Sequence, residues 1–258
     1  GIATNGTKVA VSSRDFGDGY YGQGIFVADV GVLSFSEVAG LTGIDPFALK
    51  YGGGKFVSIS TGIGASYIHW SSDGVTWSED SIATDYGREV LFDGTSWWFF
   101  CGNGTADMVV YKTTDFVTFS LQSITGIPAL TSPTYCAYAN GTYYLIGNFL
   151  YTSSDGLVWT ATATVMSVVV QGSDGEIYGA RAATDRLYSV SGVTVTEITS
   201  TAFTGTYRVI DSNDDGSIVI GPTYAASVVR VDVSAGTDTI PALATITGDY
   251  YDFAQSPI

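Results

Sequence analysis

Short runs that alternate apolar and polar residues follow one another along the chain, and pairs of turn residues separate them. Asn-Gly, Asp-Gly or Gly-rich turns stand at residues 5–6, 52–54, 93–94, 140–141, 174–175 and 215–216. Such turns between apolar runs are strong signals for β-hairpins, because glycine accepts the positive φ that a tight hairpin needs. No window shows a sustained apolar period of 3.6 residues, so we expect almost no helix.

A seven-residue phrase recurs between these hairpin turns. Its copies are residues 71–77 (SSDGVTW), 113–119 (TTDFVTF), 153–159 (SSDGLVW) and 189–195 (SVSGVTV). Asp and Gly predict a tight turn between two strands, and the final aromatic predicts an anchor that packs inward. We therefore assign a structural role to Ser71, Asp73, Gly74, Trp77, Asp115, Phe119, Ser153, Asp155, Gly156, Trp159 and Gly192.

The hairpin turns recur about every 43 residues, the length of one four-stranded propeller blade. In one repeat the predicted strands A to D are residues 134–139, 142–146, 149–152 and 158–163. The sequence thus predicts an all-β fold, a six-bladed β-propeller of four-stranded antiparallel blades that forms a single domain over residues 1–258. The predicted blades are residues 1–38 with 248–256, 44–83, 88–122, 134–163, 167–199 and 206–244.

The two ends of the chain predict how the ring closes. Residues 247–254 resemble a strand A with no strands B to D after it, whereas residues 7–37 supply strands B, C and D with almost no strand A before them. We expect the C-terminal strand to complete the first blade, which removes exposed sheet edges. Deleting residues 247–258 should then lower the melting temperature far more than an ordinary terminal truncation does.

The repeated phrase resembles the Asp-box, or BNR, repeat S-x-D-x-G-x-T-W of sialidases and many other β-propellers, with one residue fewer between Asp and Gly. In that family the box is structural and lies on the rim away from the ligand. The short form, in a chain rich in Ser, Thr, Gly and Tyr and poor in Lys, also resembles propellers of bacteriophage virion proteins. That resemblance implies a tail, fibre or capsid-surface adhesion module, at the virion surface or extracellular, within a larger chain or oligomeric assembly.

Charge and cysteine content narrow the partners and the chemistry. With a net charge of −15 and ten Lys plus Arg, the chain lacks the cation clusters that nucleic acids and anionic membranes require. The longest apolar run, residues 97–101, is too short to span a bilayer. The first residues have no basic stretch followed by an apolar one, so they do not predict a signal peptide. Cys101 and Cys136 are too few for a disulfide framework, so we expect two buried free thiols rather than a bridge.

Binding is expected in the loops between predicted strands B and C, which share one face of a propeller with the connections between blades. These loops vary in length, and variable loops on a rigid scaffold often carry function. Phe16, Tyr20 and Tyr21 suit stacking on a sugar ring or contact with a protein, or else they fold back over the first blade. The expected partner is a host-surface glycan or another virion protein. The candidate residues are Arg14, Phe16, Asp18, Tyr20, Tyr21, Arg88, Asn103, Asp107, Arg181, Arg186 and Tyr224.

Enzyme signals are weak. The Arg-Ile-Pro motif of sialidases is absent, and Glu89 is the one glutamate predicted near the central channel at the loop face. His69 has no Ser or Cys nucleophile that the sequence assigns to it. We therefore assign no catalytic residue and expect no enzymatic activity. The alternatives are a sialidase-like glycan-active enzyme and a scaffold domain of a secreted bacterial protein.

One metal signal lies near the C-terminal end. Asp211, Asn213 and Asp215 fit the first half of a calcium loop, D-x-N-x-D-G, but Val219 and Pro222 stand where closing ligands are expected. Two interpretations follow, a Ca²⁺ site and an Asp-rich hairpin turn. No other cofactor is expected.

Overall fold

The computed structural model describes residues 1–13, 24–32, 34–41, 45–61, 64–84, 86–102, 107–128, 131–171, 175–181, 186–198, 207–212, 217–222, 227–232 and 242–245. Over these residues the chain divides into two compact units. Unit 1 comprises residues 1–124 and 128–133, and unit 2 comprises residues 125–127 and 134–245. All regular elements in the described ranges are β-strands. No helix in those ranges is long and apolar enough to cross a membrane.

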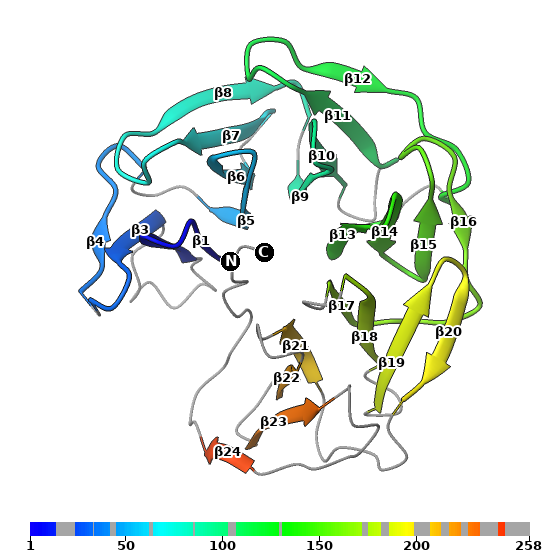
Figure 1. Cartoon of the computed structure of the whole chain (residues 1–258). Helices are drawn as coiled ribbons and strands as arrows, with labels where there is room; N and C mark the ends of the chain where they lie inside the picture. The colour runs from blue at the N-terminus through cyan, green and yellow to red at the C-terminus, as the bar shows by residue number, and fades with distance from the viewer. Residues whose placement is uncertain are drawn as a thin grey trace. The chain divides into compact units, whose positions relative to one another are not determined.

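Unit 1 contains three four-stranded antiparallel sheets, each with its strands in chain order (Figure 1). The first sheet is β1 (Ile2–Thr4), β2 (Lys8–Ser13), β3 (Gly24–Asp29) and β4 (Ser36–Glu37). The second is β5 (Pro46–Gly52), β6 (Lys55–Thr61), β7 (Ser66–Ser71) and β8 (Ser78–Ile82). The third is β9 (Gly87–Phe92), β10 (Trp97–Cys101), β11 (Val109–Thr113) and β12 (Ser120–Gln122). β1 packs on β5 and β5 on β9, while β4, β8 and β12 form the opposite edges, so the sheets fan apart.

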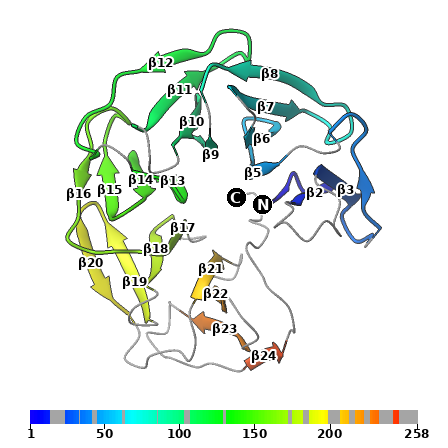
Figure 2. The same cartoon turned by 180° about the vertical axis from the view of Figure 1, so that it is seen from behind.

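Unit 2 repeats this arrangement (Figure 2). Its first sheet is β13 (Tyr135–Ala139), β14 (Thr142–Ile146), β15 (Leu150–Ser153) and β16 (Thr160–Ala161). The second is β17 (Val168–Gln171), β18 (Ile177–Arg181), β19 (Arg186–Ser191) and β20 (Thr194–Glu197). The third is β21 (Tyr207–Ser212), β22 (Ser217–Pro222), β23 (Ser227–Asp232) and β24 (Ala242–Thr245). β13, β17 and β21 pack side by side.

The core of unit 1 lies between neighbouring sheets. Val57 and Ile59 of β6 pack with Val90 of β9 and Phe99 of β10 in one buried cluster. β10 (WWFFC) is buried at every position because both of its faces are covered. β-branched and aromatic residues suit such surfaces, since they fill the space between pleated sheets. The buried faces of consecutive sheets therefore hold each unit together.

The predicted all-β architecture of four-stranded antiparallel sheets is confirmed. One outermost strand is shorter than predicted: the range 158–163 contains only Thr160–Ala161 as strand. The first sheet also has an inner strand of its own, because β1 pairs with β2. The C-terminal strand expected there lies outside the described residues, so the number of blades and the closure of the ring stay predictions.

The first copy of the repeated phrase folds into a turn built on one carboxylate. Asp73 Oδ1 accepts the backbone N–H groups two and three residues further on, at 2.8 and 2.7 Å, and the Ser71 hydroxyl at 2.9 Å. Ser71 Oγ in turn accepts the N–H of Gly74 at 2.8 Å. Trp77 donates its indole N–H to the Gly74 carbonyl at 3.0 Å and packs near Phe56. The backbone donors hold the pKa of Asp73 down, from 3.8 to about 2.

The second and third copies build the same turn. Asp115 and Asp155 each accept two backbone N–H groups at 2.8 to 2.9 Å, and the same donors lower the pKa of each carboxyl. Trp159 is buried and donates to the Gly156 carbonyl at 3.0 Å. Phe119, whose side chain has no N–H to donate, packs edge-on against Phe99. These aromatic side chains pack inward, as the sequence predicts.

The fourth copy differs because it has no Asp at the turn. β19 and β20 join through a tight hairpin in which Gly192 has a φ of 55°. Ser189 donates to the carbonyl of Thr196 at 3.5 Å and accepts none of the turn's backbone N–H groups that the structure describes. This copy is therefore an ordinary hairpin.

A Thr-Gly connection in unit 2 seats against the turn of residues 153–159. Thr125 donates its N–H to the Leu157 carbonyl at 2.8 Å and accepts the N–H of Trp159 at 2.9 Å. A Cβ on Gly126 would stand 1.8 Å from the Trp159 carbonyl oxygen. Only glycine allows this approach of the two backbones.

Candidate functional site

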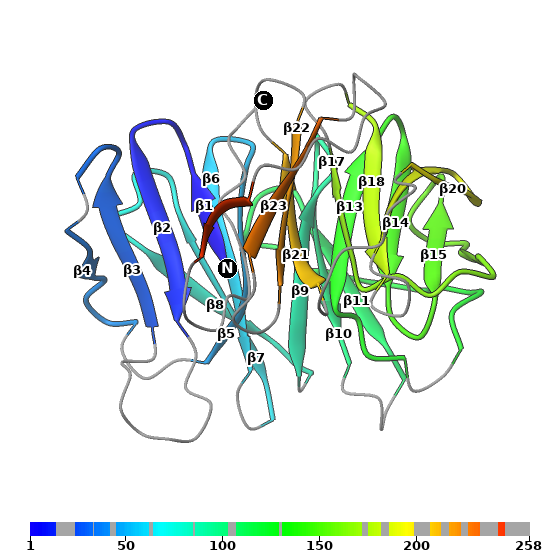
Figure 3. The same cartoon turned by 90° about the horizontal axis from the view of Figure 1, so that it is seen from below.

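The antiparallel strand order divides each unit into two ends. Hairpins between the first and second and between the third and fourth strands of a sheet lie at one end, which we call the turn end (Figure 3). The second-to-third connections and the links between sheets lie at the other, which we call the loop end. The turns of residues 71–77, 113–119 and 153–159 therefore belong to the turn end.

Four of the predicted binding residues lie in the described ranges, all at the loop end. Arg88 follows the first residue of β9, Asp107 is exposed shortly before β11, and Arg181 and Arg186 pair in register where β18 ends and β19 begins. The other predicted binding residues lie outside the described ranges: Arg14, Phe16, Asp18, Tyr20, Tyr21, Asn103 and Tyr224.

Tyr86 forms the centre of the loop-end site in unit 1, and sequence reasoning did not select it. Its side chain is 40% exposed and its φ is 64°. A left-handed backbone is unusual for a bulky aromatic residue and persists where the surroundings impose it. Two neighbouring segments make the contacts that hold the backbone in this conformation. Ser66 Oγ donates to the Thr84 carbonyl and accepts the Gly87 N–H, both at 2.8 Å. Gly102 donates its N–H to the Tyr86 carbonyl at 2.9 Å.

Arg88 and Phe47 complete this site. The guanidinium carbon of Arg88 lies 4.2 Å from the centre of the Phe47 ring, and both side chains are half-buried. Arg88 Nε also donates to the Gly102 carbonyl at 3.2 Å. A guanidinium over an aromatic face is attracted by the ring quadrupole, which fixes its orientation. Phe47, Tyr86 and Arg88 thus place two aromatic rings and one cation at the loop end of unit 1.

His69 lies close to two polar side chains that the sequence did not associate with it, and it makes a hydrogen bond with one of them, Ser60. Ser60 Oγ on β6 lies 3.0 Å from His69 Nε2, and Glu79 Oε2 on β8 lies 3.3 Å from His69 Nδ1. This order resembles a nucleophile, a base and an acid, but Ser60 and His69 are 1% and 0% exposed. Burial lowers the pKa of His69 from 6.5 to about 4. Since Ser60 Oγ is sealed in the sheet interior, Ser60 and His69 form a core contact rather than a catalytic pair.

The remaining candidates for chemistry are also internal. Cys101 and Cys136 are buried free thiols, as predicted. Burial raises the pKa of Cys101 from 9.0 to about 12, so this thiol stays protonated at neutral pH. Glu89 is buried in β9.

The calcium hypothesis concerns the end of β21. Asp211 lies in β21, while Asn213 and Asp215 lie outside the described residues. Within the described ranges, no three His, Cys, Asp or Glu side chains gather as a metal site would require. The calcium site therefore stays a hypothesis.

Comparison with known proteins identifies the family. The model of the DUF6242 beta propeller domain matches residues 66–209, more than half of the chain. The chain belongs to the DUF6242 beta propeller domain family. No curated protein sequence matches this family member significantly.

Solved structures place this DUF6242 domain among the β-propellers. Streptogramin B lyase superposes with a TM-score of 0.75 at 14% identity, over 98% of this chain and 86% of the lyase. A catalytically inactive virginiamycin B lyase from Staphylococcus aureus, with quinupristin, gives 0.70 at 12%, over 93% and 82%. A chain of the nidogen/laminin complex gives 0.61 at 10%, over 98% and 96%. At such identities the likeness concerns the fold alone. The DUF6242 domain is thus an all-β propeller of several four-stranded antiparallel sheets.

Proposed function

We propose that this propeller is a non-enzymatic recognition domain that binds a host-surface glycan at the loop end. The observation that carries the proposal is Tyr86, an exposed aromatic ring on a backbone held left-handed by Ser66 and Gly102. Such strain is retained where a side chain must be presented in one place. An exposed ring presents an apolar face to a sugar and its hydroxyl to the rim of that sugar.

Arg88 and Phe47 support a polar, flat ligand. The Arg88 guanidinium stacks on Phe47 beside the Tyr86 segment, which places a planar cation next to an aromatic platform. Hydroxyl and carboxylate groups of a sugar are acceptors for such a cation. The predicted loop residues Asp107, Arg181 and Arg186 belong to the same end of their own sheets.

Glycan-array binding of the full chain tests the proposal. Tyr86→Gly removes the ring and keeps a residue suited to positive φ, so we expect at least about a tenfold loss of glycan affinity in a folded protein. Phe35→Ser is the control, because Phe35 is 43% exposed but precedes β4 at the turn end. Equal binding by wild type and Tyr86→Gly would contradict the proposal. Release of free sugar would favour the sialidase-like alternative, and binding to a virion protein without glycan binding would replace the ligand class.

The bacteriophage setting rests on the resemblance of the repeated phrase and on the composition. We propose a tail, fibre or capsid-surface location for the domain, within a larger chain or assembly. The genes beside the coding sequence test this setting. Tail or capsid genes are expected there, whereas secretion genes in a bacterial chromosome would favour the scaffold domain of a secreted protein.

A further inference from the structure

The turn of residues 153–159 carries a second segment of the chain on its outer edge. Thr125 donates its N–H to the Leu157 carbonyl at 2.8 Å and accepts the Trp159 N–H at 2.9 Å, in a parallel β-bridge. Gly126 follows with a φ of 86°, at a place where a Cβ would collide with the Trp159 carbonyl. The turn therefore binds an extended Thr-Gly pair through backbone groups, as an added strand binds at a sheet edge.

The turn of residues 113–119 has the same backbone groups in the same arrangement. Asp115 accepts the N–H groups two and three residues further on, both at 2.9 Å, so the carboxylate geometry is repeated. Its fifth and seventh residues, Val117 and Phe119, correspond to the two that hold Thr125 in the other turn. The Val117 carbonyl and the Phe119 N–H have no hydrogen-bond partner among the described residues. This turn is therefore open where the other is occupied.

The exposure of equivalent side chains differs between the occupied turn and the open one. Trp159 is 3% exposed and Leu157 is half-buried. Phe119 is half-buried and Val117 is 79% exposed. The aliphatic residue and the aromatic residue are thus both less exposed in the turn that holds a Thr-Gly pair. A segment bound to the open turn would remove apolar surface from water, which is favourable.

The length of the preceding link explains why the chain does not cover residues 113–119 in the same way. Twelve residues, 123–134, separate β12 from β13, and they reach the turn of residues 153–159. Only four residues, 83–86, separate β8 from β9, and they contain no Thr-Gly pair. The link of the third sheet therefore cannot supply the segment that its own turn would hold.

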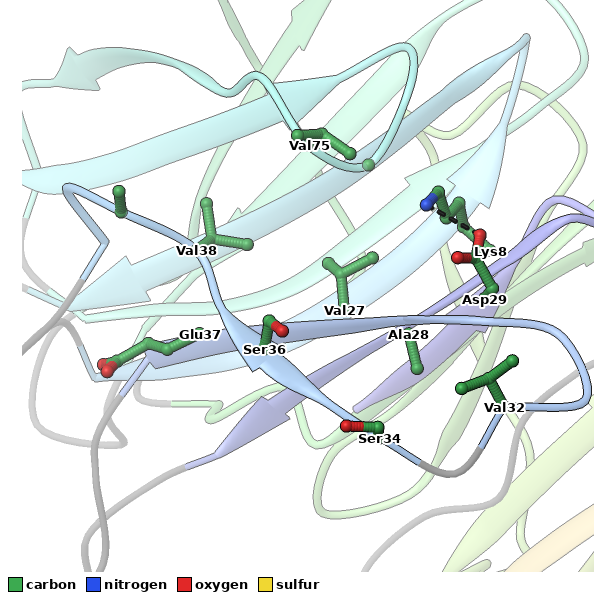
Figure 4. A pocket seen from close by; sticks show the side chains of 12 residues that line it. Lys8, Val27, Ala28, Asp29, Val32, Ser34, Ser36, Glu37, Val38 and Val75 are labelled. Atoms are coloured by element: carbon green, nitrogen blue, oxygen red, sulfur yellow. Dashed lines mark ion pairs between the residues drawn. The ribbon is translucent and has the colours of Figure 1, made fainter.

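The turn of residues 71–77 has a different setting. Val75 lines a hollow of about 380 Å³ with Val27 of β3 and residues around β4, so the first sheet flanks this turn (Figure 4). The link that precedes its sheet contains the pair Thr42-Gly43, which lies outside the described residues. This turn thus has a Thr-Gly pair in its own link, which the turn of residues 113–119 lacks.

We propose that the turn of residues 113–119 binds an extended Thr-Gly segment of a partner protein, in the way that residues 153–159 bind Thr125. The partner's threonine donates its N–H to the Val117 carbonyl and accepts the Phe119 N–H, and glycine follows it. Main-chain hydrogen bonds of this kind supply affinity at sheet edges, and the close approach of the two backbones requires the glycine. The inference is independent of the proposed glycan site, which belongs to the loop end.

A short peptide tests the requirement for glycine. The probe is acetyl-Ile-Thr-Gly-Ile-amide, which copies residues 124–127, and the control peptide has Ala in place of Gly. Each is titrated into the full chain, with NMR amide signals of residues 117–119 as the readout. Two main-chain hydrogen bonds predict a Kd on the order of millimolar for the probe. The control should bind at least about tenfold more weakly, because its Cβ would meet the carbonyl of residue 119.

Two results of this titration would overturn the proposal. One is equal affinity for the two peptides, since the turn would then not require glycine. The other is an equal shift of the amide signals of residues 157–159, because that turn already holds Thr125.

Matched variants locate the binding. Phe119→Pro removes the N–H assigned to the partner, whereas Phe119→Ala removes the same ring and keeps the N–H. The Ala variant should still bind the probe, and the Pro variant should show no shifts at millimolar peptide. Equal binding by the two variants would overturn the proposal. So would self-association of the full chain that Phe119→Pro abolishes, since a second copy would then occupy the turn.

A second pair of variants keeps the test decisive if Phe119→Pro does not fold. Val117→Ser should weaken binding of the probe about threefold, because less apolar surface is covered. Val193→Ser is the control, since Val193 holds the same position in the plain hairpin of the fourth copy and is 56% exposed. Equal effects of these two substitutions would overturn the proposal.

Discussion

Tyr86 and Phe116 are aromatic residues with nearly the same left-handed backbone, φ 64° and 58°, at opposite ends of the strands of unit 1. Phe116 takes the place of the turn glycine and is 4% exposed, with its ring stacked 5.0 Å from that of Trp70. Tyr86 is 40% exposed. The same unfavourable conformation therefore buries one ring in the core and presents the other to solvent. The turn end uses this conformation for stability, whereas at the loop end it holds a ring that is not packed in the core.

Phe116→Ala tests the turn-end half of this comparison. Loss of a buried phenyl ring should lower the free energy of unfolding by about 4 kcal/mol, because a cavity remains between Trp70 and Trp97. Urea unfolding measures this loss. The matched change Tyr86→Ala should cost less than about 0.5 kcal/mol, since the ring is exposed. Similar costs for the two variants would remove the distinction.

Acid should destabilise the sheet interior at a higher pH than it destabilises the turn end. His69 is neutral when folded, because burial lowers its pKa from 6.5 to about 4. Unfolding lets it take up a proton below pH 6.5, so stability should fall by about 3 kcal/mol as the pH drops from 6.5 to 4. His69→Gln should flatten this interval in unfolding curves measured across pH. If His69→Gln keeps the full pH dependence of stability, groups other than His69 cause that dependence.

The turn carboxylates affect the stability of the fold at lower pH than His69 does. The pKa of Asp73 falls from 3.8 to about 2 on folding, so its contribution is complete above 3.8 and is lost as the pH falls toward 2. Asp115 and Asp155 shift in the same direction. During acidification, the stability that these carboxylates contribute should therefore be lost at a lower pH than the stability lost through protonation of His69.

Ser153→Ala sharpens the contrast between the carboxylate turns and the plain hairpin. Ser153 Oγ accepts the Gly156 N–H at 2.9 Å and donates to Asp155 at 2.9 Å. Removing it should cost about 1 to 2 kcal/mol of unfolding free energy, because a buried donor loses its partner. Ser189→Ala at the same position of the fourth copy should cost under about 0.5 kcal/mol. Equal losses of unfolding free energy for the two variants would show that the first residue of the phrase stabilises the turn in every copy.

Tyr86→Gly is expected to have a small effect on stability of the opposite sign. Glycine adopts positive φ without steric cost, so the unfolding free energy should rise by up to about 1 kcal/mol. The melting temperature measures this gain, alongside the loss of glycan affinity expected above. A destabilised variant would mean that the Tyr86 ring supports the fold, and the functional interpretation of its strain would then be wrong.

Local patterns predicted the turn end well. Asp73 bonds only to groups within three residues of itself, so a seven-residue phrase specifies its geometry. The outer strands were harder to predict: β4 and β16 are exposed, pair on one side only and have no apolar alternation to mark their limits. The inner strand β1 was hidden by its three-residue length.

Contacts distant in sequence explain what prediction missed. The conformation of Tyr86 depends on Ser66 and Gly102, which belong to a preceding sheet and a following strand connection. Arg88 was selected as a residue of the predicted loop face, but Phe47 is brought to it only by the packing of β5 on β9. Ser60 and His69 meet diagonally across two strands, a relation that register alone reveals.

The carboxylate turns also bear on chemical ageing. An Asp-Gly pair decays to isoaspartate when the glycine nitrogen attacks the side-chain carbonyl of the preceding Asp. In residues 71–77 that nitrogen is bound to Ser71 Oγ, and the carboxylate is ionised and fixed by the amides that follow it. The turn of residues 153–159 restrains its own pair in the same way. These two carboxylate turns thereby protect their Asp-Gly pairs from a rearrangement to which such pairs are otherwise prone.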